Sequence, residues 1–253
     1  MELQDQVVFI TGGAGGLGRA MCHEFANQGA RLIVGYRSNA VGAAALIGEL
    51  GGDGHSAKEA PVEDSRRLTS LAGEIEAEYG RLDILINNAG IAINGKIASH
   101  SNAAWQALID TNVSAVFYLS RAAIGHMRQQ GGGVIINMSS ECGLIGYEDL
   151  AAYSATKGAI VMFTKVLALD HASDKIRVNA ICPGDIDTPM TDIGWQALNL
   201  TSEEIREKLK EHIPIGRVGR TEDIAAAAMF LASDAAGFVT GAILPVDGGT
   251  TTR

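Results

Sequence analysis

The feature that most constrains the fold is a glycine-rich turn between a buried strand and a helix near the start of the chain. The apolar run at residues 7–10 has the pattern of a buried strand, and it leads into Thr-Gly-Gly-Ala-Gly-Gly-Leu-Gly at residues 11–18. Residues 17–27 have the apolar spacing of an amphipathic helix, and residues 31–34 form a second apolar run. This order predicts a strand–helix–strand unit, in which a right-handed crossover makes the two strands parallel.

The same alternation of apolar runs and helical patterns continues along most of the 253 residues. Further strands are expected at residues 84–86, 134–136, 177–181 and 242–246, and helices at residues 66–79, 103–127, 155–173 and 221–232. Alternation of this kind predicts an α/β fold with a doubly wound, mostly parallel sheet and helices on both faces. No linker, repeat or low-complexity tract interrupts the pattern, so residues 1–253 are expected to form a single domain.

Composition argues against several kinds of partner. The formal net charge is −9 and Lys and Arg form no cluster, which argues against binding to nucleic acid or to an anionic membrane. The apolar stretches are too short to span a bilayer and the first residues have no signal-peptide pattern, so a cytoplasmic protein is expected. The three cysteines have neither zinc-site nor disulfide spacing, and the six histidines have no ligand spacing. No catalytic metal is therefore expected.

The glycine-rich turn lies after a strand and at the start of a helix, which fits a phosphate-binding role. Glycines allow the backbone to approach a diphosphate closely, and the N-terminus of the helix faces its negative charge. The spacing is Gly-x-x-x-Gly-x-Gly, at Gly12, Gly16 and Gly18, rather than the commoner Gly-x-Gly-x-x-Gly. A tight turn that serves only packing is the alternative interpretation of the same glycines.

Three polar residues in the second half of the chain indicate proton transfer. Tyr153 and Lys157 are four residues apart, so on a helix they share one face, and an ammonium beside a phenol favours the phenolate. A free tyrosine has a pKa of about 10, and the cation is expected to lower this pKa toward the working pH. Ser140 follows the apolar run at residues 133–138, so its hydroxyl is expected at the carboxyl edge of a parallel strand. Together with the glycine turn, this set predicts hydride transfer between a dinucleotide and a substrate.

Five motifs occur together in a fixed order along the chain. They are the glycine turn, Asn87-Asn88-Ala89-Gly90, Asn112, the set of Ser140, Tyr153 and Lys157, and Pro183-Gly184. In this order and spacing the chain resembles the short-chain dehydrogenase/reductase family over its whole length. The resemblance implies a Rossmann fold with a seven-stranded sheet in one domain, assembled into homotetramers or homodimers. It also implies an NAD(P)-dependent alcohol dehydrogenase or carbonyl reductase with a small-molecule substrate.

The resemblance further implies a role for each motif residue. Tyr153 would be the acid–base residue, Lys157 would hold the nicotinamide ribose and lower the tyrosine pKa, and Ser140 would orient the substrate oxygen. Asn112 would hold a water in the proton relay, unless its side chain only bonds to its own helix backbone. The implied cofactor contacts are Gly12, Gly16, Leu17, Gly18, Asn88, Ala89, Gly90, Tyr153, Lys157, Pro183, Gly184, Ile186 and Thr188.

The residues after the second strand favour NADP(H). Relatives specific for NAD usually have an aspartate at the position of Tyr36, and here that carboxylate is absent. Arg37 is instead expected to pair with the 2′-phosphate of the cofactor, with Ser38 and Asn39 as hydrogen-bond donors. If Arg37 points to solvent, the enzyme is expected to accept NAD(H) as well. Pro61 also replaces an aspartate that usually contacts the adenine amino group, which removes that one contact.

The sequence constrains the identity of the substrate less than it constrains the type of reaction. Residues 189–214 match the substrate lid of the family, and the candidate pocket residues are Glu141, Cys142, Tyr147, Asp185 and Trp195. This mixture of polar and aromatic groups suits a hydroxylated substrate such as a sugar or polyol. Reduction of a 3-oxoacyl thioester on an acyl carrier protein is the alternative, although the chain is acidic and Asp174 stands where such reductases have an arginine. A non-enzymatic dinucleotide sensor is a second alternative, but such sensors commonly lose the tyrosine or the lysine.

Apolar residues occur on more than one face of the helices expected at residues 103–127 and 155–173. Ala159, Ile160, Met162, Phe163, Val166 and Leu167 illustrate this distribution. One sheet covers only one face of each helix, so a second burial partner is expected. We therefore expect a homotetramer, or a homodimer, assembled through these helices and the C-terminal segment that ends in Asp247-Gly248-Gly249.

Overall fold

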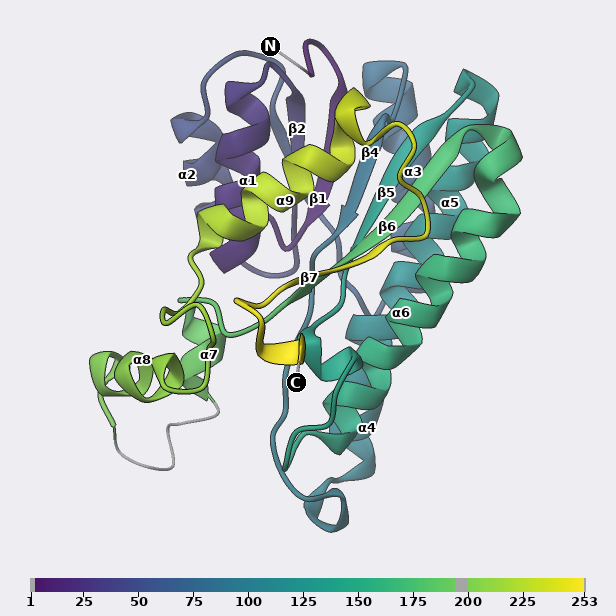
Figure 1. The fold of residues 1–253 in the computed structure, drawn as a ribbon. Coiled ribbons are helices and arrows are strands. Elements are labelled where there is room, and N and C mark those ends of the chain that lie inside the picture. The colour runs from purple at the N-terminus through teal and green to yellow at the C-terminus, as the bar shows by residue number, and fades with distance from the viewer. Residues whose placement is uncertain (1–2, 194–199, 253) are drawn as a thin grey trace.

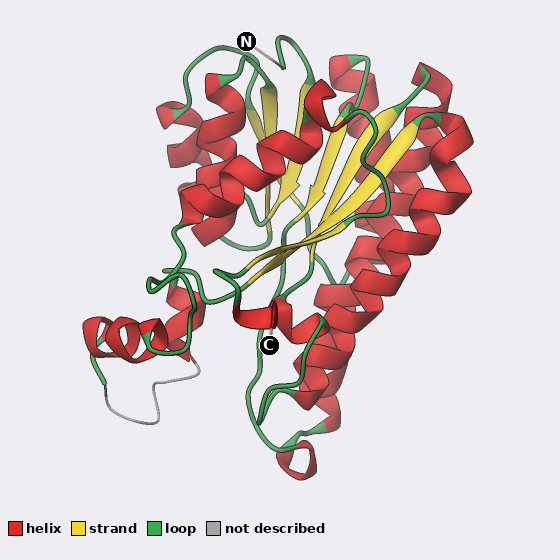
Figure 2. Cartoon of the chain, viewed as in Figure 1, coloured by secondary structure: helices red, strands yellow, loops and turns green. Residues whose placement is uncertain are grey.

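The computed structural model of the chain describes residues 3–193 and 200–252. These residues contain one seven-stranded sheet with helices packed against both faces (Figures 1 and 2). The strands are β1 (Val7–Thr11), β2 (Arg31–Tyr36), β3 (Ser56–Glu59), β4 (Ile84–Asn87), β5 (Gly133–Met138), β6 (Ile176–Pro183) and β7 (Ile243–Val246). All neighbouring strands are parallel, in the order β3-β2-β1-β4-β5-β6-β7. The predicted doubly wound sheet is confirmed, and its order reverses between β1 and β4, where such sheets bind ligands.

The helices form a layer on each face of the sheet. They are α1 (Gly16–Asn27), α2 (Ala40–Glu49), α3 (Ser65–Tyr79), α4 (Asn102–Ile109), α5 (Ala115–Gln130), α6 (Ala151–His171), α7 (Pro189–Ile193), α8 (Ser202–Lys210) and α9 (Thr221–Ala232). Side chains alternate along each strand, so Val8 and Ile10 of β1 pack in the core beneath α1, α2 and α9. Phe9 packs in the other core, beneath α3, α5 and α6.

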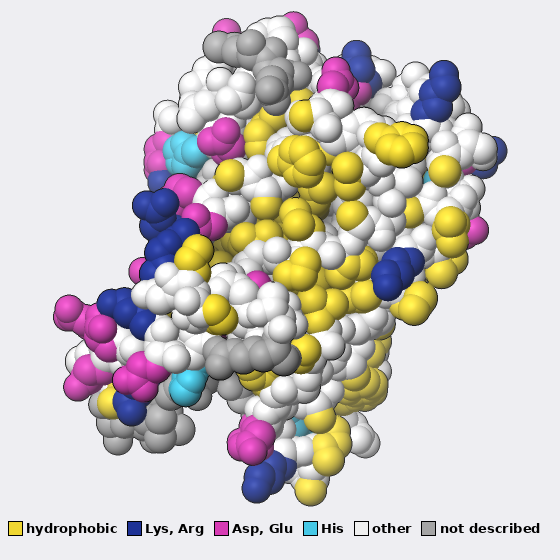
Figure 3. Space-filling view, viewed as in Figure 1, with side chains coloured by type: hydrophobic (Ala, Val, Ile, Leu, Met, Phe, Trp, Pro, Cys, Tyr) yellow, Lys and Arg dark blue, Asp and Glu magenta, His cyan; other side chains and the backbone are white. Residues whose placement is uncertain are grey.

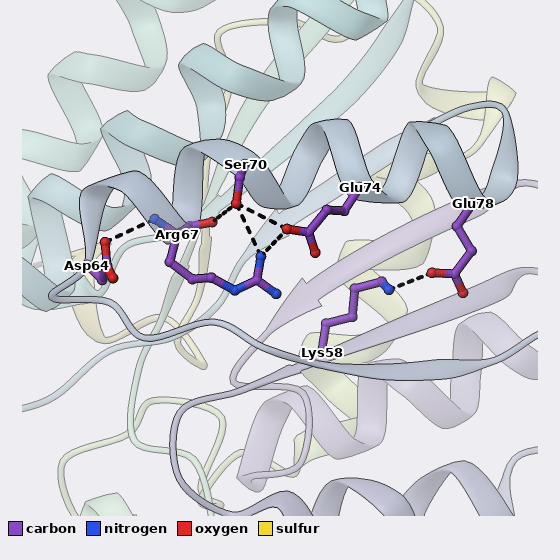
Figure 4. Close-up of polar contacts among 6 residues, drawn as sticks. All are labelled: Lys58, Asp64, Arg67, Ser70, Glu74 and Glu78. Carbon is purple, nitrogen blue, oxygen red and sulfur yellow. Dashed lines mark hydrogen bonds and ion pairs between the residues drawn. The ribbon is translucent and has the colours of Figure 1, made fainter.

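α2 and β3 lack the apolar sequence patterns that predicted the other elements. β3 lies at the edge of the sheet and has no fully buried residue, so its sequence has no apolar run. Its register is fixed by pairing with β2, and Lys58 forms an ion pair with Glu78 of α3 (Figure 4). Backbone pairing and one ion pair therefore hold a strand that hydrophobic periodicity does not indicate.

The start of α3 is capped by a side chain. Asp64 accepts hydrogen bonds from the backbone nitrogens of Arg66 and Arg67, both at 3.0 Å. Farther along the helix, Arg67 contacts Ser70 and Glu74 (Figure 4). The cap satisfies two of the backbone donors that every helix leaves open at its first turn.

The segment predicted as a substrate lid contains α7 and α8. Figure 1 shows both helices beyond the carboxyl ends of the strands, apart from the sheet. Ile205 and Leu209 of α8 form a small apolar cluster with Ile213 and Val218, separate from the two main cores. In the described part of the chain, no helix combines the length and apolar character needed to cross a bilayer.

Candidate active site

A cavity of about 520 Å³ lies at the carboxyl ends of β1, β4, β5 and β6. The predicted catalytic and cofactor residues that line it are Gly12, Gly16, Leu17, Asn88, Ala89, Gly90, Ser140, Tyr153, Lys157, Pro183, Gly184, Ile186 and Thr188. Gly18, Arg37 and Asn112 are not part of this lining. The fold thus brings most of the predicted set to one place, although its members are far apart in sequence.

The glycine turn forms an open cradle at one end of the cavity. Gly12 has a φ of +63°, and a Cβ there would lie 3.2 Å from the Cα of Ala89. Gly15 caps α1 without a side-chain hydrogen bond, so the first amide groups of this helix remain available to a ligand. A cradle without side chains at a helix N-terminus fits the diphosphate of a dinucleotide.

Gly18 has a packing role in the structure. A Cβ at Gly18 would lie 2.7 Å from the Cα of Gly13 and 2.9 Å from Nδ2 of Asn88. The residue is buried within α1 rather than exposed to the cavity. A glycine at this position allows close packing of the helix against the turn, and the predicted contact of Gly18 with the cofactor stays a prediction.

Thr11 ties the glycine turn to the end of β4. Its hydroxyl oxygen accepts hydrogen bonds from the backbone nitrogens of Asn88 and Ala89, both at 3.0 Å. In return, Nδ2 of Asn88 donates to the carbonyl of Thr11 at 2.9 Å and to that of Gly12 at 3.2 Å. Sequence reasoning missed this positioning role of Thr11, for which its place at the start of the turn was the only signal.

Ser140, Tyr153 and Lys157 meet where β5 ends and α6 begins. The Ser140 oxygen accepts a hydrogen bond from the backbone nitrogen of Cys142 at 3.2 Å, and the same hydroxyl interacts with the Tyr153 phenol. Lys157 is buried, and its Nζ donates to the carbonyl of Met138 at 2.9 Å. The same Nζ lies 5.6 Å from the centroid of the Tyr153 ring.

Burial dominates the ionisation of the tyrosine and the lysine. It raises the pKa of Tyr153, and hydrogen bonding with Ser140 opposes this only in part. Burial also lowers the pKa of Lys157 to about 8. The expected lowering of the tyrosine pKa by Lys157 was therefore wrong for the chain alone, because desolvation disfavours both charged forms and the ammonium lies over the ring face.

Asn112 lies in a π-helical turn, Asp110–Ser114, that interrupts the helix predicted at residues 103–127. Its buried amide accepts from the backbone nitrogen of Ile91 and donates to the Ile91 carbonyl, each at 2.9 Å. The amide nitrogen also donates to the hydroxyl of Thr156 at 3.1 Å. The side chain thus binds the segment after β4 and the neighbouring helix α6, rather than its own helix backbone. Such π-turns are frequent at functional sites.

The residues predicted to select the cofactor lie at the end of β2. Tyr36 is the last residue of the strand, and Arg37 follows it with an exposed side chain. The side-chain oxygen of Asn39 accepts a hydrogen bond from Gly42 at 2.9 Å and caps α2. Only the amide nitrogen of Asn39 is therefore left to donate to a phosphate.

The predicted substrate residues separate into three groups. Glu141, Cys142 and Asp185 line the cavity, whereas Tyr147 does not. Trp195 lies outside the described residues.

Burial raises the pKa of the Cys142 thiol to about 11, which fits a packing residue rather than a nucleophile. Asn94 also lines the cavity and had no motif that could reveal it, whereas Met190, which lines it too, lies in the segment predicted as the lid. No cluster of three or more His, Cys, Asp or Glu side chains suited to a metal occurs at residues 3–193 and 200–252.

Comparisons with known proteins give one reaction class and several substrates. A family model described as enoyl-(acyl carrier protein) reductase matches residues 12–251. The chain is 39% identical to 3beta-hydroxysteroid dehydrogenase 1 of Eggerthella lenta, over 99% of this chain and 95% of the relative. It is 37% identical to D-threitol dehydrogenase of Mycolicibacterium smegmatis, over 100% of this chain and 95% of the relative. It is 35% identical to a 3-oxoacyl-(acyl-carrier-protein) reductase of Thermotoga maritima, over 98% of this chain and 99% of the relative.

Proposed function

The chain belongs to the short-chain dehydrogenase/reductase family and is a nicotinamide-dependent oxidoreductase, and we propose that it interconverts a small hydroxylated alcohol and the corresponding carbonyl compound. The observation that carries this proposal is the shared cavity, which the open glycine cradle lines together with Ser140, Tyr153 and Lys157. A bound nicotinamide supplies or accepts the hydride. The protein supplies the proton and the orientation of the substrate.

Tyr153 is the proposed acid–base residue. Because burial raises its pKa, the phenol is neutral near pH 7 and is in the correct state to donate a proton to a carbonyl oxygen. In the oxidative direction the tyrosine must first lose its proton, and the phenolate oxygen then takes the alcohol proton as the hydride leaves for the cofactor. Ser140, whose hydroxyl interacts with the phenol in the chain alone, donates to the same substrate oxygen and holds that oxygen beside the phenol.

Lys157 is proposed to serve the cofactor and the tyrosine together. Its Nζ donates one hydrogen to Met138, so two hydrogens remain for the ribose hydroxyls of the nicotinamide. When protonated, the buried ammonium stabilises a developing phenolate more strongly than it would in water. Asn112 positions these groups by tying the segment after β4 to α6. Both of its amide hydrogens are bonded, but its Oδ1 accepts one hydrogen bond and can accept a second from the water of the proposed proton relay.

A polyol or sugar is the proposed substrate class. Carboxyl groups at Glu141 and Asp185 line the cavity, and hydroxyl groups are good donors to carboxylates. The likeness to D-threitol dehydrogenase supports this class, whereas the likeness to a 3-oxoacyl-(acyl-carrier-protein) reductase supports the alternative. An acidic carrier is disfavoured because Asp174, which pairs with Arg128 and His171, stands where such reductases have an arginine.

The finer assignments are part of the same proposal. NADP(H) is the preferred cofactor, because Arg37 is exposed at the end of β2 and no carboxylate occupies the position of Tyr36. The active particle is a homotetramer in the cytoplasm. Residues 189–214 act as the substrate lid.

Replacement of Tyr153 by Phe tests the proposed function. We expect Tyr153→Phe to reduce kcat by about 100-fold or more, because general acid–base catalysis contributes about this much. Cofactor affinity, measured by fluorescence titration, is expected to stay near that of the parent enzyme because the ring is retained. Lys157→Ala is expected to weaken both cofactor binding and turnover, followed by nicotinamide absorbance.

Two outcomes would contradict the proposal. If the kcat of Tyr153→Phe stays within about tenfold of the parent value, the activation free energy rises by no more than about 1.4 kcal/mol. Tyr153 would then not be the acid–base residue. Cofactor binding without turnover of any alcohol, ketone or acyl thioester in a broad panel would favour the dinucleotide sensor.

A further inference from the structure

Residues 185–188, which follow β6, connect the cavity to α8, and we call them the cavity segment. Ile186 and Thr188, both predicted cofactor contacts, line the cavity, whereas Asp187 between them is not among the described residues that line it. The Asp187 side chain is 60% exposed and bonds to α8 instead. It is therefore placed to hold the two residues beside it without touching the cofactor.

Arg206 of α8 binds the Asp187 carboxylate. Its Nε and Nη2 both donate to Oδ1 of Asp187, at 2.8 Å and 2.6 Å. Its Nη1 donates to the carbonyl of Ser202, one turn earlier in the same helix, at 3.2 Å. The Arg206 side chain is only 15% exposed, so the guanidinium is largely shielded from water. A charge-assisted pair with two hydrogen bonds is among the stronger polar contacts of a protein surface.

The backbone makes a second connection between α8 and the cavity segment. The Asp187 nitrogen donates to the Gly219 carbonyl at 2.8 Å, and the Gly219 nitrogen donates to the Asp185 carbonyl at 2.9 Å. Val218, beside Gly219, belongs to the small apolar cluster of α8, which is separate from the two main cores. Because so little apolar surface holds α8, the ion pair between Arg206 and Asp187 accounts for a large share of its attachment.

The inner side of the cavity segment contacts the glycine turn. A Cβ at Gly16 would lie 3.4 Å from Cγ2 of Thr188, so the two residues adjoin. The hydroxyl of Thr191 donates to the carbonyl of Ile186, which ties the segment to α7. A small displacement of the segment would therefore move Ile186 and Thr188 relative to the glycine cradle, where the cofactor diphosphate is proposed to bind.

We infer that Arg206 is a positioning residue for the cofactor site and that it acts through Asp187. The ion pair holds α8 and the cavity segment as one unit, so it keeps Ile186 and Thr188 in the position that contacts the cofactor. When the pair is lost, α8 detaches more often, the segment shifts and the cofactor binds less tightly. This inference rests on the proposed cofactor site, but the attachment of α8 can be tested without any cofactor.

The first test measures hydrogen exchange of the α8 amides in the chain alone. Asp187→Asn and Arg206→Gln each remove one charge of the pair, and each is expected to speed this exchange about fivefold, the upper end of the range for exposed ion pairs. Asp187→Asn should have no further effect in the Arg206→Gln background, because both act on one contact. Arg206→Lys keeps the charge without the planar two-donor geometry, so an intermediate rate is expected.

The second test measures the Kd for NADPH and for NADH by fluorescence titration. Asp187→Asn and Arg206→Gln are each expected to raise both Kd values about fivefold. The ratio of variant to parent Kd should fall toward one at about 1 M sodium chloride, where an exposed ion pair is screened. Arg31→Gln is the matched control, since it removes an arginine–aspartate pair of 2.7 Å at the amino ends of the strands. It should leave both α8 exchange and cofactor affinity unchanged.

Four results would overturn the inference. Unchanged exchange of the α8 amides in both single variants would show that the pair does not hold the helix. Faster exchange with unchanged Kd values would show that α8 does not position the cofactor site. Equal effects of Arg31→Gln and Arg206→Gln would assign the change to net charge. If the parent chain binds neither NADPH nor NADH, the proposed function is overturned, and this inference with it.

Discussion

Burial controls the charge of each ionisable side chain around the cavity. It raises the pKa of Tyr153, raises that of Glu141 to about 7 and lowers that of Lys157 to about 8. All three shifts favour the neutral form. Neutral groups exchange protons with a substrate near pH 7 more readily than groups fixed in one charged state. Burial in the wall of the cavity thus keeps the proposed acid, Tyr153, in its protonated form.

Arg37 carries the prediction about cofactor choice. We expect Arg37→Ala to raise the KM for NADP(H) by one to two decades and to change that for NAD(H) little. A hydrogen bond to a charged group contributes about 1.5–3 kcal/mol, which corresponds to this range. Adding a carboxylate by Tyr36→Asp should then shift the preference toward NAD(H), because it accepts from the ribose hydroxyls and repels a phosphate. Steady-state kinetics with both cofactors at equal ionic strength provide the measurement.

The matched control for Arg37 is Arg128→Ala. Arg128 is also an exposed arginine, but it lies in the last turn of α5, near the amino ends of the strands. Its removal should leave the ratio of the two KM values unchanged. A parent enzyme that already prefers NAD(H), or an equal effect of the two alanine variants, would mean that Arg37 does not contact the cofactor. Hydride transfer would be unaffected by that result.

Spacing along the chain predicted the residues whose chemistry depends on local geometry. Tyr153 and Lys157 share a helical face, and Ser140 follows a strand. Once the fold class was predicted, these positions were enough to expect the three side chains at one site. The partners of Asn112 and Thr11 were not predictable, because Ile91, Thr156 and Asn88 approach them only through tertiary packing.

At the scale of elements, apolar periodicity predicted the central strands and most of the helices that cover them. It failed for β3, where an edge position removes the need for a buried run. It also failed for α2, which contains two glycines and buries only Ala43 and Leu46. The π-turn at Asp110–Ser114 is not indicated by the pattern because the backbone stays helical on both sides of it, so the sequence predicts one continuous helix. Local sequence thus predicts what packs on the sheet centre, whereas edges and irregular turns depend on their neighbours.

The Asp64 cap allows a stability prediction for α3. We expect Asp64→Ala to reduce the free energy of unfolding by about 1 kcal/mol, because two first-turn amide groups lose their acceptor. For a chain of this size the melting temperature should fall by about 2–4 °C. Differential scanning calorimetry at one fixed protein concentration measures the change.

Asp53→Ala is the control for the cap, because Asp53 is exposed in the loop between α2 and β3. It removes the same charge without removing a cap, and we expect its melting temperature to match that of the parent. Equal destabilisation by both variants would assign the effect to net charge. No destabilisation by Asp64→Ala would mean that water replaces the cap at no cost.

At the scale of the whole molecule, the residues that the structure describes leave two separate apolar areas exposed. On α6 the outward side chains of Met162, Val166 and Leu169 are 59%, 48% and 80% exposed. On the inner side of the same helix, Ile160 is buried in the chain and Leu167 packs against the core. On the opposite face, Phe230 and Phe238 are 45% and 105% exposed. Figure 3 shows hydrophobic side chains gathered across the middle of the face that carries α9 and β7.

Two apolar areas on opposite faces predict a homotetramer, because each area forms a two-fold contact with a second copy and two different two-fold contacts generate four subunits. Light scattering at micromolar concentration should therefore give four times the mass of one chain. We expect the double substitution Val166→Lys and Leu169→Lys to reduce this mass to that of a dimer, since four lysines then face one another across the α6 contact. Val41→Lys replaces an 83% exposed valine on α2 and should keep the tetramer. A monomer for the parent chain would contradict the assembly, and a tetramer for the double variant would exclude α6 from the contact.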